Sequence, residues 1–134
     1  GGAVTGRIDQ VANGQPVSVY PVVRNVYTPL YEDDYVEKTI AAAGIAKVGA
    51  EVVNVGGTEP VTIQEYCAIA GEFLGKEPVF VENSRAWPIW GDTTKLVELL
   101  GPNTVSVREG IRRVIESRHE RLAAAHHVVG TPAE

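Results

Sequence analysis

The densest group of side chains suited to ligand contact lies between residues 85 and 90. Arg85, Trp87 and Trp90 bring one cation and two large aromatic surfaces into this short stretch. Tryptophan and arginine offer large contact areas at small entropic cost, which suits a ligand wall or a protein contact. The same side chains also suit an irregular loop packed over the core, so both interpretations stay open.

A second candidate group lies in a loop bracketed by Pro21 and Pro29. This loop contains Arg24 and Tyr27, and loops of this kind often carry binding groups. We expect Arg24 and Tyr27, together with the Arg85 cluster, to contact a small-molecule substrate. The alternative for this loop is a solvated surface without a ligand.

Residue types for catalysis and metal binding lack suitable partners. No nucleophile stands at a recognisable spacing from a base. His119, His126 and His127 have no carboxylate or cysteine placed to complete a ligand set, so no metal site is predicted. A lone cysteine, Cys67, cannot form an internal disulfide and is expected in the core.

The composition is that of one soluble domain. The chain has 134 residues, 44% of them hydrophobic and 22% charged, with a net charge of −5. The acidic balance argues against a nucleic-acid partner. No apolar run is long enough to span a bilayer and no signal peptide is visible, so we expect no membrane partner and a cytoplasmic location.

Hydrophobic spacing and turn residues predict alternating helices and strands. Helices are expected over residues 4–13, 33–44, 62–75, 92–101 and 106–122, and strands over 17–20, 52–55 and 78–81. Asp33 or Asp34 is expected to cap the second helix. That helix would bury a face made of Val36, Ile40 and Ala43.

The segment 52–55 is unusual among these elements. It reads Val-Val-Asn-Val and is followed by two glycines, a pattern typical of a strand buried on both faces of a parallel sheet. Such a strand needs neighbours on both edges, yet the chain offers only two other strand candidates. We infer that part of the sheet is missing or is supplied by another chain.

Four segments in sequence order resemble the extended short-chain dehydrogenases, the NAD-dependent epimerase/dehydratases. Residues 29–36 resemble the family's aromatic–Ile–His–Val–Asp–Asp segment at the start of a helix. Residues 53–65 are similar to its unit of strand, Asn-x-Gly, capping box and helix. Residues 92–101 and 105–111 resemble its C-terminal signature of two consecutive helices.

The resemblance implies that the chain is the C-terminal, substrate-side portion of such an enzyme. The expected fold class is α/β, with a partial Rossmann-like sheet edge and a small α/β substrate-binding domain. This domain would cover residues 1–122, and residues 123–134 would form a flexible tail. In the complete enzyme, which would use NAD or NADP, Asn54 would lie near the cofactor at the end of a sheet strand.

The family's catalytic parts are absent from the sequence. No glycine-rich turn follows a strand, and none of the lysines has a tyrosine four residues before it. We therefore expect the chain alone to hold no cofactor and no catalytic residue, and to need a Rossmann-domain half as partner. The alternative is a non-catalytic binding or assembly module that self-associates with a second copy through its exposed sheet strand.

Two departures from the family pattern bear on the substrate. The position where nucleotide-sugar members place a diphosphate-binding arginine holds Tyr27, and the stretch between Arg85 and Asp92 is shorter than usual. Both departures argue against a nucleotide-diphosphate substrate.

Overall fold

The structure is a computed structural model that describes the backbone of residues 3–129 and the side chains of residues 4–119. In chain order its elements are α1 (Ala3–Ala12), β1 (Val17–Val19), β2 (Val26–Tyr27), α2 (Glu32–Gly44), β3 (Val61–Thr62), α3 (Ile63–Leu74), β4 (Phe80–Glu82), α4 (Thr94–Leu100) and α5 (Val107–Val129). No helix in the described residues is long and apolar enough to cross a membrane.

The strands form two small sheets. β1 and β4 run parallel, with Val17 opposite Phe80, and β2 and β3 run antiparallel, with Val26 opposite Thr62. The expected strands at 17–20 and 78–81 are therefore confirmed in substance. The α/β class is confirmed as well, since helices and both kinds of strand pairing occur in one chain.

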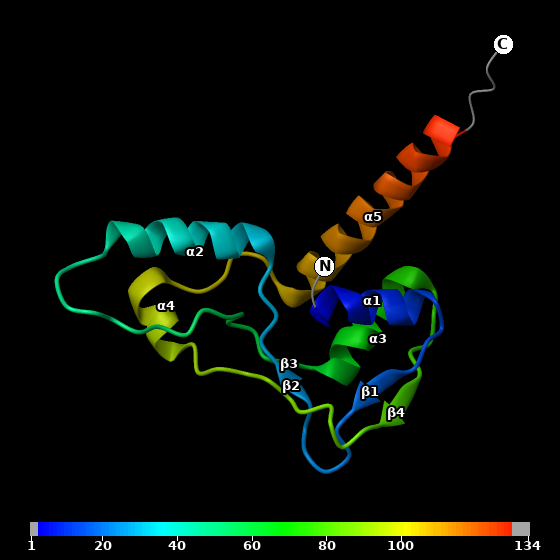
Figure 1. Ribbon diagram of the computed structural model, residues 1–134, viewed down its shortest axis with the longest axis horizontal. Helices are drawn as coiled ribbons and strands as arrows, with labels where there is room; N and C mark the ends of the chain where they lie inside the picture. The colour runs from blue at the N-terminus through cyan, green and yellow to red at the C-terminus, as the bar shows by residue number, and fades with distance from the viewer. Residues whose placement is uncertain (1–2, 130–134) are drawn as a thin grey trace.

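The hydrophobic core lies where α1, α3 and α5 pack beside β1 (Figure 1). Each helix contributes apolar residues at helical spacing, and β1 contributes its two inward valines. The most completely buried members are Ile8, Val11, Val17, Cys67, Ala70 and Ile111. The predicted core position of Cys67 is confirmed.

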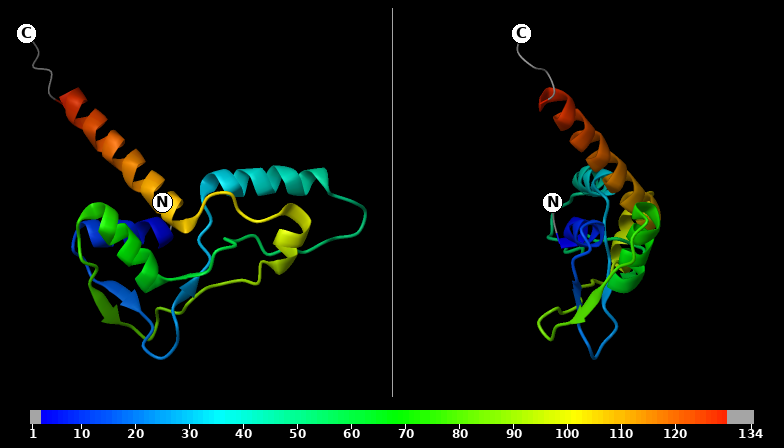
Figure 2. Two further views of the ribbon diagram at one scale, coloured as in Figure 1. Left: turned by 180° about the vertical axis from the view of Figure 1, so that it is seen from behind. Right: turned by 90° about the vertical axis from the view of Figure 1, so that its right-hand side faces the viewer.

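α2 and α4 lie apart from this core and close to each other (Figures 1 and 2). Two buried polar side chains on α2 tie it to the last residue of α4 and to the chain that follows it. Asp34 accepts hydrogen bonds from the Thr104 and Val105 N–H groups at 2.8 and 2.9 Å. The Lys38 ammonium donates to the carbonyl oxygens of Leu100 and Pro102 at 2.7 and 2.8 Å.

The predicted buried strand at 52–55 is wrong for the described residues. This segment belongs to no sheet, and Val52 and Val55 are 81% and 53% exposed. A strand needs hydrogen-bonding partners on at least one edge, and no described segment lies in position to supply them. The apolar run is therefore present without the strand pairing that its pattern predicted.

The prediction for the face of α2 is also wrong. Val36 and Ile40 are 53% and 68% exposed, and Ala43 is exposed as well. The buried residues of α2 are Asp34 and Lys38 instead, and both form hydrogen bonds with groups of residues 100–105. The apolar stripe of this helix therefore faces outward.

Helix caps were predicted with mixed success. Thr62 and Glu65 form the expected capping box at the start of α3. The cap of α2 is Tyr31, which makes no side-chain capping bond, so neither Asp33 nor Asp34 has the predicted role. At the other end of the chain the α5 backbone stays helical to Val129, while the rest of the predicted tail lies outside the described residues.

Candidate functional site

Two loops carry the aromatic and basic residues singled out in the sequence, and they meet below the small sheets (Figure 1). The rings of Tyr20 and Trp87 stack with centroids 4.6 Å apart and an interplanar angle of 28°. Tyr27 forms an isolated parallel bridge with Ile89. The predicted residues Tyr27 and Trp87 therefore lie on neighbouring segments.

The first of these loops is shaped by Asn25. Its side-chain oxygen accepts from the Tyr20 N–H at 2.7 Å, and its amide group donates to the Tyr20 and Val23 carbonyl oxygens. Asn25 is only 2% exposed, so these bonds are shielded from water. They close the turn between β1 and β2 and hold Tyr20 in place for the stack on Trp87.

The remaining predicted substrate residues face solvent. The Arg24 guanidinium lies 3.7 Å from the Glu65 carboxylate, and both side chains are more than half exposed. Arg85 is exposed and its backbone N–H donates to the Asn83 side chain at 2.9 Å. Trp90 is 63% exposed. These three residues are available to a partner or a ligand, but they do not enclose a cavity with each other.

Asn54 lies on a different part of the surface. Its amide group donates to the Asp92 carbonyl oxygen at 3.1 Å, and Gly91 lies against its side chain. Asp92 in turn accepts from the Thr94 N–H at 2.9 Å, in the turn that begins α4. Hydrogen bonding by Thr94 lowers the pKa of Asp92, and the larger effect comes from the Thr94 side chain, followed by its backbone N–H.

We call the aromatic and basic residues of these two loops the loop cluster: Tyr20, Arg24, Tyr27, Arg85, Trp87 and Trp90. Sequence analysis did not single out Tyr20. The sequence placed Tyr20 only as the last residue of a predicted strand, because local patterns cannot predict its stacking on Trp87, which lies far along the chain. The alternation of 17–20 gave the one available signal, since it placed Tyr20 and Ser18 on the face opposite the buried Val17 and Val19.

Among the glycines that the structure describes, Gly56 and Gly57 do not form a cradle for a dinucleotide. A pyrophosphate site needs a glycine-rich turn between a strand and a helix, whereas β3 runs directly into α3. Gly56 and Gly57 serve another purpose: a Cβ on Gly57 would lie 1.9 Å from the Pro29 carbonyl oxygen. The Gly57 N–H donates to the Thr28 carbonyl oxygen at 3.0 Å, so this glycine lets two chain segments meet.

No cluster of three potential metal ligands occurs among the described residues. The ionisable groups beside the loop cluster are instead engaged in local contacts. Hydrogen bonds from Thr62 lower the pKa of Glu65, and Arg24 lies beside the same carboxylate. Glu65 is therefore engaged with Thr62 and Arg24 rather than free.

Solved structures of other proteins share the fold of this chain. The sequence matches no family model and no curated protein. Among solved structures, UDP-glucose 4-epimerase from Thermotoga maritima, in complex with UDP-glucose, is 28% identical with a TM-score of 0.68. The match covers 90% of this chain but only 40% of that enzyme. This chain has the fold of part of an NAD-dependent epimerase.

Two further structures support the same assignment. UDP-glucuronic acid 4-epimerase from Bacillus cereus, in complex with UDP-glucuronic acid and NAD, is 26% identical with a TM-score of 0.67, over 83% of this chain and 37% of that one. An epimerase from Methanothermobacter thermautotrophicus shares the fold at 17% identity, with a TM-score of 0.68 over 92% and 40%. The predicted resemblance to a portion of the extended short-chain dehydrogenases is confirmed.

Proposed function

We propose that this chain is the substrate-binding portion of an NAD(P)-dependent epimerase/dehydratase-like oxidoreductase. The observation that carries the proposal is the asymmetry of the structural match. It takes in 90% of this chain but 40% of the Thermotoga maritima enzyme. The larger share of that fold, with the dinucleotide-binding half, would have to lie outside these 134 residues.

The exposed apolar surface supports a companion of this kind. Val52 and Val55 on the unpaired segment, and Val36 and Ile40 on α2, are all more than half exposed. Exposed apolar surface marks interaction sites in soluble proteins where it is contiguous, and these two segments are the candidates for such a surface here. A parallel sheet that accepted residues 52–55 as a strand would satisfy their backbone groups and cover these valines.

Within the assembled enzyme, we assign substrate contact to the loop cluster and the cofactor side to Asn54. Tyr27, Trp87 and Trp90 would supply apolar and aromatic surface, while Arg24 and Arg85 would supply charge. The chain's own residues would bind and orient the substrate. Hydride transfer would be the chemistry of the nicotinamide and of the catalytic residues in the other half.

A dinucleotide titration tests this proposal. We expect calorimetry with NAD(H) or NADP(H) to show no saturable binding to the isolated chain up to about 1 mM, a level at which a site worth about −4 kcal/mol would be seen. The Bacillus cereus enzyme, crystallised with NAD, serves as the positive control. Micromolar binding by the isolated chain would refute the assignment of the cofactor to a separate half.

A second candidate function rests on the same exposed segment. The chain could be a non-catalytic module in which residues 52–55 of two copies pair edge to edge. Sedimentation at increasing protein concentration separates the two functions. A substrate-side portion stays monomeric without its companion, whereas the assembly module shifts to a dimer that substitution of Val52 and Val55 by lysine abolishes.

A further inference from the structure

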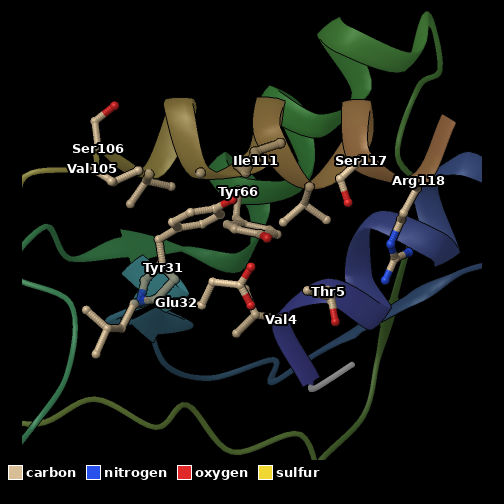
Figure 3. A pocket seen from close by; sticks show the side chains of 15 residues that line it. Val4, Thr5, Tyr31, Glu32, Tyr66, Val105, Ser106, Ile111, Ser117 and Arg118 are labelled. Carbon is tan, nitrogen blue, oxygen red and sulfur yellow. The ribbon is translucent and has the colours of Figure 1, made fainter. Parts of the chain in front are cut away.

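A cavity of about 360 Å³ opens between the N-terminal end of α1, the start of α2 and the inner face of α5. It lies apart from the loop cluster, and none of Arg24, Trp87 or Trp90 lines it. Figure 3 shows the rings of Tyr31 and Tyr66 side by side at this cavity, above Glu32 and Val4. Its volume lies near the lower end of ligand pockets in proteins, so it suits a small molecule.

Tyr66 is the buried polar group of this cavity. Its side chain comes from α3 and the residue is 5% exposed. Its hydroxyl makes no hydrogen bond with any residue that the structure describes. Burial raises the pKa of this phenol well above its ordinary value, so it stays neutral and can both donate and accept. Tyr66 lines the cavity, so its hydroxyl is placed to exchange a hydrogen bond with a ligand there.

Glu32 supplies the uncompensated charge. Its carboxylate lines the cavity and forms no ion pair within the described part of the chain. The other formal charge on the lining, Arg118, is paired with Asp9. Arg113 approaches the Tyr31 ring at 5.5 Å, but it is held by Glu109 and Asp33. Among the described residues, the charge that remains unpaired at the cavity is therefore negative.

We propose that this cavity binds a small organic amine in its protonated form. The ammonium group would donate to the Glu32 carboxylate and to the Tyr66 hydroxyl, as charge-assisted hydrogen bonds that favour cations. The two tyrosine rings attract a cation through their faces. The apolar stem would lie on Val4, Ile111 and Val114. All of these groups belong to this chain, so the inference does not depend on the proposed function.

The test is an NMR titration of the full chain with n-butylammonium chloride. We expect saturable shifts in the amides of residues 4–6 and 110–114, with a dissociation constant in the millimolar range. Sodium butyrate and n-butanol have the same stem without the cation, and neither should give saturable shifts at these amides. Equal responses to all three probes, or no saturation with the amine, would overturn the proposal.

Three variants assign the effect to its residues. Glu32→Gln should weaken butylammonium binding about tenfold, and Tyr66→Phe, which keeps the ring, should weaken it about threefold. Glu37→Gln removes an exposed carboxylate of α2 that does not line the cavity, and it should change binding less than twofold. If Glu32→Gln folds and binds the amine as the parent does, the site is not the one proposed. Should either cavity variant lose its native spectrum, the other variant decides.

Discussion

Asp34 shows how one residue can serve a different purpose from the one its sequence context indicates. It stands in the first turn of α2, where an acid usually caps or complements the helix. Instead it is fully buried and receives three hydrogen bonds, from the N–H and hydroxyl of Thr104 and from the Val105 N–H. Burial tends to raise the pKa of Asp34, but these bonds outweigh it and the pKa falls below its ordinary value of 3.8.

Replacing Asp34 by asparagine should therefore destabilise the chain by about 2 kcal/mol at neutral pH, because an amide NH₂ would face backbone donors. A carboxylate with a lowered folded-state pKa stabilises fully above its unfolded pKa, and this stabilisation is lost as the pH falls through the folded value. The stability difference between parent and Asp34→Asn should thus shrink as the pH drops below 3.8. Urea unfolding at several pH values measures it.

Asp33→Asn is the matched control. Its carboxylate is exposed and pairs with Arg113 at 3.1 Å, so the variant should cost less than about 1 kcal/mol. Equal losses of unfolding free energy in the two variants would show that the buried hydrogen bonds of Asp34 stabilise the chain no more than the exposed ion pair of Asp33 does.

Cys67 should be chemically inert in the folded chain. It is 0% exposed, and burial raises the pKa of its thiol to about 11. Since the thiolate is the reactive form, a rise from 9.0 to about 11 cuts its fraction near pH 8 by about a hundredfold. Alkylation with iodoacetamide should be slow in buffer and rapid in denaturant. Fast native alkylation would place this part of α3 outside the core.

The residue-level predictions succeeded where the signal is local. Thr62 and Glu65 are three residues apart and satisfy each other within one turn, so their capping box was visible in the sequence. The contacts of Asp34 with Thr104 and of Tyr20 with Trp87 join residues about 70 positions apart. Periodicity and capping rules carry no information about such pairs, and only the folded chain reveals them.

At the scale of elements, the close approach of residues 56–57 to residues 28–29 provides a sharp steric test. Gly57→Ala would place a methyl group 1.9 Å from the Pro29 carbonyl oxygen. We expect a loss of about 1–3 kcal/mol, as for other overpacked sites. Gly6→Ala, in the middle of α1, meets no atom within 4 Å and should stabilise the chain by about 0.5–1 kcal/mol. Thermal unfolding compares the two, and a stable Gly57→Ala variant would contradict the described packing.

Helices α1, α3 and α5 were predictable because their buried faces meet other elements of the same chain. Ile8 and Val11 on α1, and Ile111 and Ile115 on α5, lie at helical spacing and are buried as expected. The stripe on α2 and the run at 52–55 have the same kind of pattern, but both are exposed. Hydrophobic patterning predicts that a face is buried, but it does not identify the element that would bury it.

At the scale of the whole molecule, the two groups of elements differ in how they are held. The α1, α3, α5 and β1 group shares an apolar core cluster, whereas the buried residues of α2 are the polar Asp34 and Lys38, which hydrogen-bond to residues 100–105. This difference follows if the outward face of α2 and the segment 52–55 acquire their apolar neighbours only in an assembled enzyme. The placement of the candidate substrate residues on a separate pair of loops is compatible with such an assembly.

Hydrogen exchange at the amides of Val52, Val53 and Val55 measures whether this segment has a strand partner within its own chain. We expect these amides to exchange at nearly unprotected rates in the monomeric chain, because no described segment pairs with them. The amides inside α3, which lies in the core, should exchange at least about a hundredfold more slowly. Strong protection of residues 52–55 in a verified monomer would mean that the segment already has a strand partner in its own chain, and would contradict the account.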